Sequence, residues 1–206
     1  MLITAGADAT RDSQGFLMNR QRLTNSLNLD YNQSYNLISK GYDTDNIMAD
    51  GGSFSIWIYP TDMGGGDYGR IFEKGAIHYC FLGSVSGIQS KLEYTVKFST
   101  SGICSFVTDN RDITLNKWNH IAVAYDGSAT LNIALIYING ILVDSTASES
   151  RSGTISDDSA HDMYVGNRAD FTRHFDGQID DLNFYSDFLT AAEVKRNYNA
   201  GKRSHR

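Results

Sequence analysis

Hydrophobic and polar residues alternate along most of the chain after residue 25, with the period of two that is typical of β-strands. Glycines and short polar clusters separate the alternating stretches at spacings typical of a β-sandwich. The pattern therefore predicts an all-β fold of two packed antiparallel sheets. The predicted strands cover residues 26–30, 53–59, 70–73, 77–82, 92–98, 103–107, 117–126, 133–138, 141–143 and 163–166, with a last strand within 175–185.

Three local patterns are especially clear. Residues 117–126 are nearly continuous in apolar and small side chains, which is expected of a central strand covered on both faces. Asn139-Gly140 between two apolar strands predicts a tight β-hairpin. Thr190 followed by Glu193 forms a capping-box sequence, so we predict one short C-terminal helix that ends near Gly201.

The last strand carries an acidic residue among apolar ones. Alternation places Asp180 on the same face as Leu182 and Phe184, so its carboxylate is predicted to point where the apolar side chains point. A carboxylate on a buried face is costly unless backbone donors or a cation satisfy it. Asp181 is predicted to point to the opposite face, into solvent.

The length of 206 residues fits one all-β domain. Residues 1–25 are polar and weakly patterned, and we predict an N-terminal arm or an extra strand there. Residues 26–206 are then the folded domain. No internal repeat divides it.

Charge and targeting signals narrow the function classes. With 18 Lys and Arg against 24 Asp and Glu, the net charge is −6, which argues against a general nucleic-acid or anionic-membrane surface. No apolar run is long enough for a transmembrane helix, so membrane insertion is not expected. The first residues do not read as a secretory signal. The localisation is therefore open, and release by lysis would suit display on a virion surface.

The positions of the cysteines and histidines do not indicate a disulfide, a zinc site or a catalytic base. Cys80 and Cys104 both lie in apolar, strand-like surroundings, and we interpret them as buried free thiols rather than a disulfide. No Cys/His cluster has the spacing of a zinc site. His120, in the central strand, is interpreted as a hydrogen-bonded core residue rather than a catalytic base.

One loop has the composition of a glycan-binding site. Sugars present an apolar face ringed by hydroxyl groups, so they suit an aromatic side chain beside charged and amide groups. Residues 167–174 have this mixture, and residues 62–68 have it less clearly. A solvated connection is the alternative for both loops. The candidate ligand-binding residues are Arg168, Asp170, Phe171 and Arg173.

Four motifs in order resemble the laminin-G-like branch of the concanavalin A-like lectin/glucanase superfamily, over roughly residues 26–201. The resemblance implies a jelly roll of two antiparallel sheets, whose members mostly bind glycans or proteins at a concave face or at rim loops. The motifs are F-S-I-W-I-Y-P from Phe54, W-x-H-I-A-V-x-Y-D from Trp118, I-Y-I-N-G from Ile136, and F-D-G-x-I-D-D-L-x-F-Y from Phe175 with the helix that starts L-T-A-A-E-V.

The resemblance also implies a calcium ion that ties the last strand to earlier loops. Asp180 resembles the family's calcium-holding aspartate. The matching carbonyl groups would come from around Asp50 and Gly51 and from near Asp30. Such oxygen ligands suit Ca²⁺. The alternative is that Asp180 only caps backbone N–H groups at a strand bend.

Because the superfamily includes glucanases, a glycoside hydrolase is the enzymatic alternative. Such enzymes carry paired carboxylates, and retaining ones hold them about 5 Å apart. The glutamates here do not alternate on one strand, and Glu73 and Glu93 fall on different predicted strands.

We therefore predict a non-catalytic module that recognises a glycan or a protein. A purely structural or decoration protein of an assembly, such as a virion, is the other alternative. In that case homo-oligomers would assemble through residues 1–25.

Overall fold

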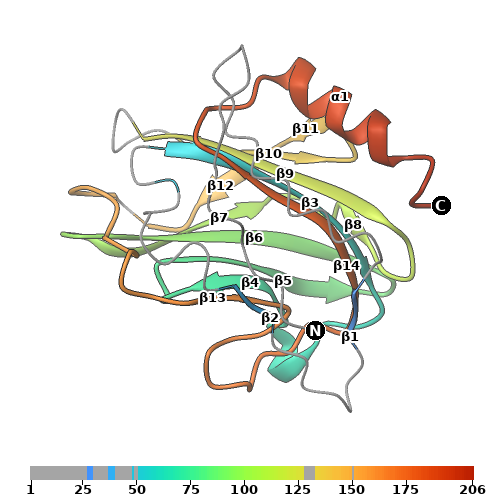
Figure 1. The fold of residues 1–206 in the computed structure, drawn as a ribbon, viewed down its shortest axis with the longest axis horizontal. Helices are drawn as coiled ribbons and strands as arrows, with labels where there is room; N and C mark the ends of the chain where they lie inside the picture. Colours follow the sequence, from blue (N-terminus) through green and yellow to red (C-terminus); the bar gives the residue numbers. More distant parts are fainter. Residues whose placement is uncertain (1–26, 30–36, 40–47, 49–50, 128–132, 150) are drawn as a thin grey trace.

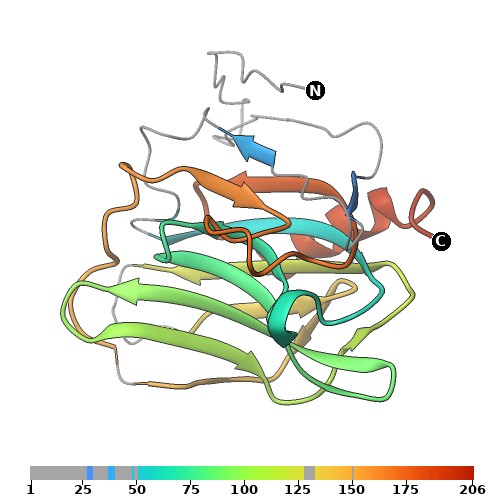
Figure 2. The same cartoon turned by 90° about the horizontal axis from the view of Figure 1, so that it is seen from below.

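The structure, a computed structural model, describes residues 27–29, 37–39, 48, 51–127, 133–149 and 151–206. Two antiparallel sheets stack face to face, and one helix lies outside them (Figures 1 and 2). This arrangement confirms the predicted all-β sandwich with one C-terminal helix. The predicted arm, residues 1–25, lies outside the described residues. Within the described part of the chain, no helix is both long and apolar enough to cross a bilayer.

The first sheet contains six of the described strands, in the order β1-β14-β3-β9-β10-β11. Strand β14 therefore lies between the first strand and β3, although it comes last in the chain. The strands of this sheet are β1 (Leu27–Leu29), β3 (Gly51–Pro60), β9 (Asn119–Asp126), β10 (Leu135–Ile138), β11 (Ile141–Val143) and β14 (Gly177–Tyr185).

The second sheet contains eight of the described strands, in the order β12-β7-β6-β5-β4-β13-β2, with β8 also paired to β6. A short 3₁₀ helix, η2 (Gly65–Asp67), precedes β4. The strands of this sheet are β2 (Leu37–Ser39), β4 (Arg70–Lys74), β5 (His78–Ser86), β6 (Gln89–Phe98), β7 (Gly102–Thr108), β8 (Ile113–Thr114), β12 (Ser145–Ala147) and β13 (Met163–Val165).

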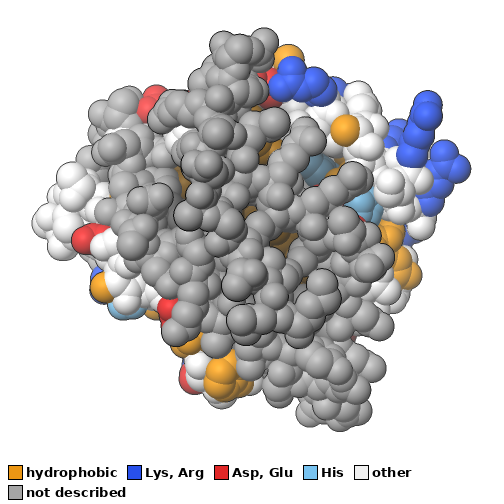
Figure 3. All heavy atoms as spheres, in the orientation of Figure 1, with side chains coloured by type: hydrophobic (Ala, Val, Ile, Leu, Met, Phe, Trp, Pro, Cys, Tyr) orange, Lys and Arg blue, Asp and Glu red, His pale blue; other side chains and the backbone are white. Residues whose placement is uncertain are grey.

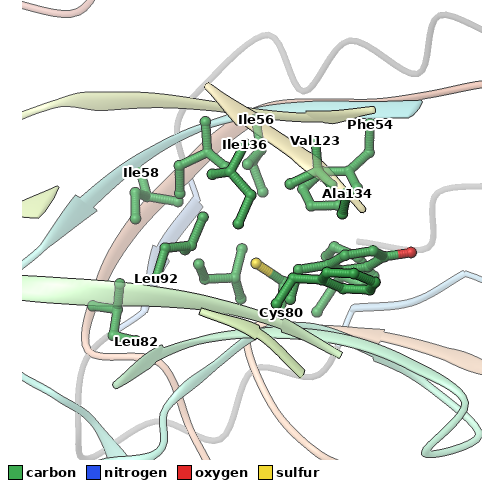
Figure 4. Packing of buried hydrophobic residues seen from close by; sticks show 14 of the residues in the cluster. Phe54, Ile56, Ile58, Cys80, Leu82, Leu92, Val123, Ala134 and Ile136 are labelled. Carbon is green, nitrogen blue, oxygen red and sulfur yellow. The ribbon is translucent and has the colours of Figure 1, made fainter. Parts of the chain in front are cut away.

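The main hydrophobic core fills the space between the sheets. Phe54, Ile56 and Ile58 point from β3 toward the second sheet, as their alternation predicts (Figure 4). Leu82 and Cys80 point back from the opposite sheet. Cys80 and Cys104 are both buried and free, which confirms the interpretation of the two thiols.

The predicted hairpin and helix are confirmed. Asn139 and Gly140 both have positive φ, as the tight turn between β10 and β11 requires. Thr190 caps the N-terminus of helix α1 (Ala191–Gly201). Its side chain accepts a hydrogen bond from the Glu193 N–H group, and the Glu193 carboxylate accepts one from the Thr190 N–H group.

Helix α1 covers part of the outer face of the six-stranded sheet. Leu189 and Val194 form a second apolar cluster there with Ala122 of β9 and Tyr137 of β10. Strand β9 is therefore buried on both faces, by the main core and by α1, as its nearly continuous apolar sequence predicts.

A β-bulge in β14 reverses the predicted orientation of Asp180. Asp180 pairs with Trp57, but Asn183 pairs with Ser55, so three steps along β14 match two along β3. Asp181 lies at the bulge and has a φ of 49°. Because of this bulge, Leu182 and Phe184 pack against the core, whereas Asp180 lies beside Trp57 on the outer face. The predicted shared face was wrong.

A buried charged cluster lies at one end of the main core. Lys74 Nζ and Asp158 Oδ1 are 3.2 Å apart, and both side chains are fully buried. His78 Nε2 lies 3.8 Å from the other oxygen of Asp158, and His78 Nδ1 is 3.0 Å from the Tyr94 hydroxyl. Asp158 comes from the long connection between β12 and β13, so this cluster anchors that connection to β4 and β5.

Candidate functional site

The predicted ligand-binding loop, residues 167–174, connects β13 to β14 and has a defined internal geometry. The buried Asn167 organises it, because its Oδ1 accepts hydrogen bonds from the N–H groups of Arg168 (2.8 Å) and Arg173 (3.1 Å). Phe171 has a φ of 62° and remains 47% exposed. The loop therefore presents one aromatic ring to solvent on a hydrogen-bonded frame.

Arg168 and Asp170 form a two-armed ion pair within this loop. Arg168 Nε donates to Asp170 Oδ1 at 2.9 Å, and its Nη2 donates to Oδ2. The hydrogen bond from Arg168, with others from Thr172, holds the pKa of Asp170 well below its usual range. The same hydrogen bond raises the pKa of Arg168. Both groups are therefore charged at neutral pH, and each holds the other in place.

Arg173 joins the two loops that the sequence singled out. Its Nη1 donates to the Gly66 carbonyl at 2.9 Å, and its guanidinium lies 5.1 Å from the centre of the Tyr68 ring. The Gly65 N–H group donates to the His174 carbonyl at 2.8 Å. Residues 62–68 and 167–174, about one hundred positions apart in the sequence, thus form one continuous rim.

Behind this rim, aromatic side chains gather on the outer face of the eight-stranded sheet. Arg70 lies between two of them, with its guanidinium 4.5 Å from the ring centres of both Tyr79 and Phe81. Its Nε donates to Glu73 at 2.9 Å. We call this surface the aromatic strip, and it consists of Tyr68, Arg70, Tyr79, Phe81, Tyr164 and Phe171.

Ring contacts connect each half of the strip, and Glu73 lies between the two halves. Tyr68 lies 5.9 Å from Phe81, and Phe81 lies 5.9 Å from Tyr79. Strand pairing places Tyr79 beside Glu73 and Glu73 beside Tyr164. The Tyr164 ring is 6.3 Å from that of Phe171, which brings the predicted loop into the strip.

Two glutamates share the outer face of this sheet, which the sequence did not reveal. Glu73 pairs with Tyr79 and Glu93 with Phe81, so the two lie two strands and two residues apart. By strand spacing their Cα atoms are roughly 12 Å apart. Partial burial raises the pKa of Glu93, against the opposing effect of Arg70. Glu73 is committed to its ion pair with Arg70.

Of the predicted calcium ligands, the two that the structure describes, Asp180 and Gly51, do not lie together. Asp180 is opposite Trp57, whereas Gly51 is six residues away along β3, a distance of roughly 20 Å. Asp50 and Asp30 lie outside the described residues. Near Asp180 the structure instead places Asp181 and His205, whose ligand atoms all lie within 4.8 Å of one another. Carboxylate oxygens suit Ca²⁺, but an imidazole nitrogen is not one of its usual ligands.

Strands β4 and β5 supply the residues that the sequence analysis missed. Tyr79 and Phe81 alternate with Cys80 and Leu82, so the sequence does separate two faces. Both faces are apolar, however, and alternation alone does not say which one meets the core. Trp57 is buried and Trp118 is half-buried, and neither belongs to the aromatic strip.

Two stacked antiparallel sheets with an outer helix define a jelly-roll protein of the concanavalin A-like type. A family comparison agrees: residues 30–195 match the family described as the concanavalin A-like lectin/glucanases superfamily, Laminin_G_3. The chain belongs to this family. A comparison with curated proteins found no match.

Solved structures share the fold at low sequence identity. A heptameric SAP-like pentraxin from Limulus polyphemus has a TM-score of 0.60 at 15% identity, over 82% of this chain and 79% of its own. A candidate carbohydrate-binding protein from Bacteroides ovatus has 0.61 at 17%, over 83% of this chain and 46% of its own. Domain 4 of a Geobacillus stearothermophilus arabinanase, solved with arabinotriose, has 0.50 at 18%, over 84% and 86%. This chain therefore spans less than half of the Bacteroides protein.

Proposed function

We propose that this protein is a non-catalytic glycan-binding module whose site is the aromatic strip with its rim loop. The observation that carries the proposal is the group of rings around the buried Arg70, together with the Tyr164–Phe171 pair on the other side of Glu73. Aromatic rings suit the apolar faces of sugars, and the guanidinium and carboxylate groups beside them suit the hydroxyls. The Arg168–Asp170 pair offers such groups already fixed in position.

The arrangement of the two glutamates favours recognition over hydrolysis. A retaining glycosidase holds its two carboxyl groups about 5 Å apart, and an inverting one about 6.5–9.5 Å apart. Glu73 and Glu93 start from Cα positions roughly 12 Å apart, and Glu73 is already bonded to Arg70. The pair therefore supports recognition of a glycan rather than cleavage of it.

Replacing Phe171 by alanine is expected to weaken glycan binding by about 5- to 30-fold, because an exposed ring at the end of the strip is lost. A glycan array on the intact chain identifies the probe, with arabinotriose included, and calorimetric titration of the best binder gives the dissociation constants. Phe188→Ala is the matched control, since Phe188 is another exposed phenylalanine outside the strip. Equal affinities for the two variants would rule out the strip as the site.

We also propose that calcium, the cofactor implied by the family resemblance, is held at Asp180 and Asp181 rather than at Gly51. The support is the proximity of the two carboxylates on the bulged strand. Bound calcium would supply a fixed positive charge there. Within the protein itself, Asp180 Oδ1 accepts a hydrogen bond from the Asp181 N–H group at 2.8 Å, which fixes the orientation of this carboxylate.

Calcium at about 100 times its dissociation constant is expected to raise the melting temperature by about 5–10 °C, because a ligand that binds only the folded state stabilises it. Asp180→Asn should abolish this rise. Differential scanning calorimetry with calcium and with EDTA measures it. Asp187→Asn, at an exposed acidic residue outside the cluster, should keep the full effect. A calcium-dependent rise that persists in Asp180→Asn would disprove the assignment.

A further inference from the structure

A polar cavity of about 280 Å³ lies between the outer face of the six-stranded sheet and helix α1. Helix α1 lies on the side of the six-stranded sheet that faces away from the eight-stranded sheet (Figure 1), so the cavity between helix and sheet lies away from the aromatic strip. Its polar walls come from three strands and the helix, and include Ser55, His120, Asp181, Asn183, Tyr185 and Asn197.

The cavity exists because α1 contacts the sheet at two separate places. Leu189 and Val194 pack in the apolar cluster at one end of the helix. At the other end Gly201 lies so close to Trp57 that a side chain there would collide with the indole nitrogen. Between these contacts the sheet presents the small, polar Ser55 instead of a large apolar residue, so the space is left unfilled.

Hydrogen bonds hold the polar groups of the cavity in place. Asn197 Nδ2 donates to the Tyr185 hydroxyl at 3.1 Å, and the Ser55 hydroxyl is 3.3 Å from the same oxygen. Asn183 Nδ2 donates to the Asp181 carbonyl at 2.8 Å. The walls are therefore preorganised, which lowers the cost of binding a ligand.

His120 supplies a buried group that lacks a partner. Its side chain is 2% exposed, and its Nδ1 has no hydrogen-bond partner among the described residues. Burial, and secondarily His205, lowers the pKa of His120 to about 4, so the ring is neutral at neutral pH. A neutral imidazole offers one donor and one acceptor, and leaving either unmet in a buried site is unfavourable. A ligand hydroxyl could donate to or accept from Nδ1, depending on the tautomer.

The charge of the cavity narrows the class of ligand. Asp181 contributes a carboxylate, and the described lining residues include no Lys or Arg. Lys195 and Lys202 lie over the Tyr198 ring, and Lys and Arg side chains gather on the outer surface around α1 (Figure 3). Most of its polar wall consists of neutral hydroxyl, amide and imidazole groups, and no described lining residue is a Lys or Arg that could pair with an anion. We propose that the cavity binds a small neutral polyol, of the size of a monosaccharide or a cyclitol.

The ring resonances of His120 test this proposal in the intact, ¹⁵N-labelled chain. Long-range ¹H–¹⁵N NMR spectra are recorded while D-glucose, D-galactose, L-arabinose or myo-inositol is added to about 10 mM, a range suited to millimolar dissociation constants. At least one probe is expected to shift the His120 ring signals in a saturable way. Asn197→Leu and Ser55→Val, which fill the cavity, should each weaken this effect at least about tenfold.

Two control variants test whether the ligand binds in this cavity rather than elsewhere on the protein. Asn199→Leu makes the same change at an exposed position of the same helix and should leave the His120 shift unchanged. Phe171→Ala should impair the aromatic strip and also leave this shift unchanged, so the two proposals fail independently. If no probe moves the His120 signals, the cavity holds only solvent and the proposal is wrong. A shift that survives both cavity-filling variants would overturn it as well.

Discussion

Replacing Asp158 by alanine is expected to destabilise the protein by about 3–5 kcal/mol, because the partner charge would remain buried without compensation. Lys74 and Asp158 are fully buried and 3.2 Å apart. The substitution also removes the carboxylate beside His78 and loosens the connection between β12 and β13. Urea unfolding followed by tryptophan fluorescence measures the change in free energy.

Two controls define the cause of this loss. Asp157→Ala changes the neighbouring acidic residue, which is exposed, and should cost at most about 1 kcal/mol. Replacing both partners, Lys74→Met with Asp158→Leu, should recover much of the stability, since no lone charge is then buried. If the single Asp158→Ala variant is as stable as Asp157→Ala, the ion pair contributes nothing to the fold.

Lowering the pH from 7 to 5 is expected to cost about 4 kcal/mol of stability through His78 and His120, about 2 kcal/mol from each. Burial, and secondarily Lys74, lowers the pKa of His78 to about 3, and that of His120 is lowered to about 4. Both rings resist protonation in the folded protein, whereas in the unfolded chain they take up protons near pH 6.5. Their contribution is therefore fully present above that pH and falls as the pH drops toward the folded values.

Urea unfolding at pH 7 and pH 5 measures this dependence. His120→Asn should remove about half of the loss, because one of the two buried rings no longer titrates. His161→Asn is the control, since His161 is exposed and should leave the loss unchanged. A stability that is the same at both pH values would show that neither ring is buried in its neutral form.

The periodicity of apolar residues predicted the β-sandwich, because a strand with a buried face needs apolar residues at the positions that face the core. The strands within residues 53–59 and 117–126 were predicted correctly, because each packs against neighbours that leave little room for polar side chains. The start of the helix was also predicted correctly, because its capping box is a local interaction between Thr190 and Glu193 that the sequence shows directly.

Asp180 was misplaced because alternation assumes a regular strand. One inserted residue reverses every later side chain, and the bulge at Asp181 does this without a glycine to mark it. The aromatic strip was missed for a different reason. It is assembled from β4, β5, β13 and two loops, and a single sequence does not state which strands pair. The loop from 167 to 174 was found only because its composition is unusual by itself.

The position of β14 between β1 and β3 has a consequence for biosynthesis. The six-stranded sheet cannot form completely until residues 177–185 have left the ribosome, so β3 keeps an open edge until then. Until then the nascent chain exposes unpaired backbone and one face of its future interior to other molecules. Protection of this edge therefore depends on a strand made more than one hundred residues later, and a chaperone that shields the edge of β3 should raise the yield of folded protein.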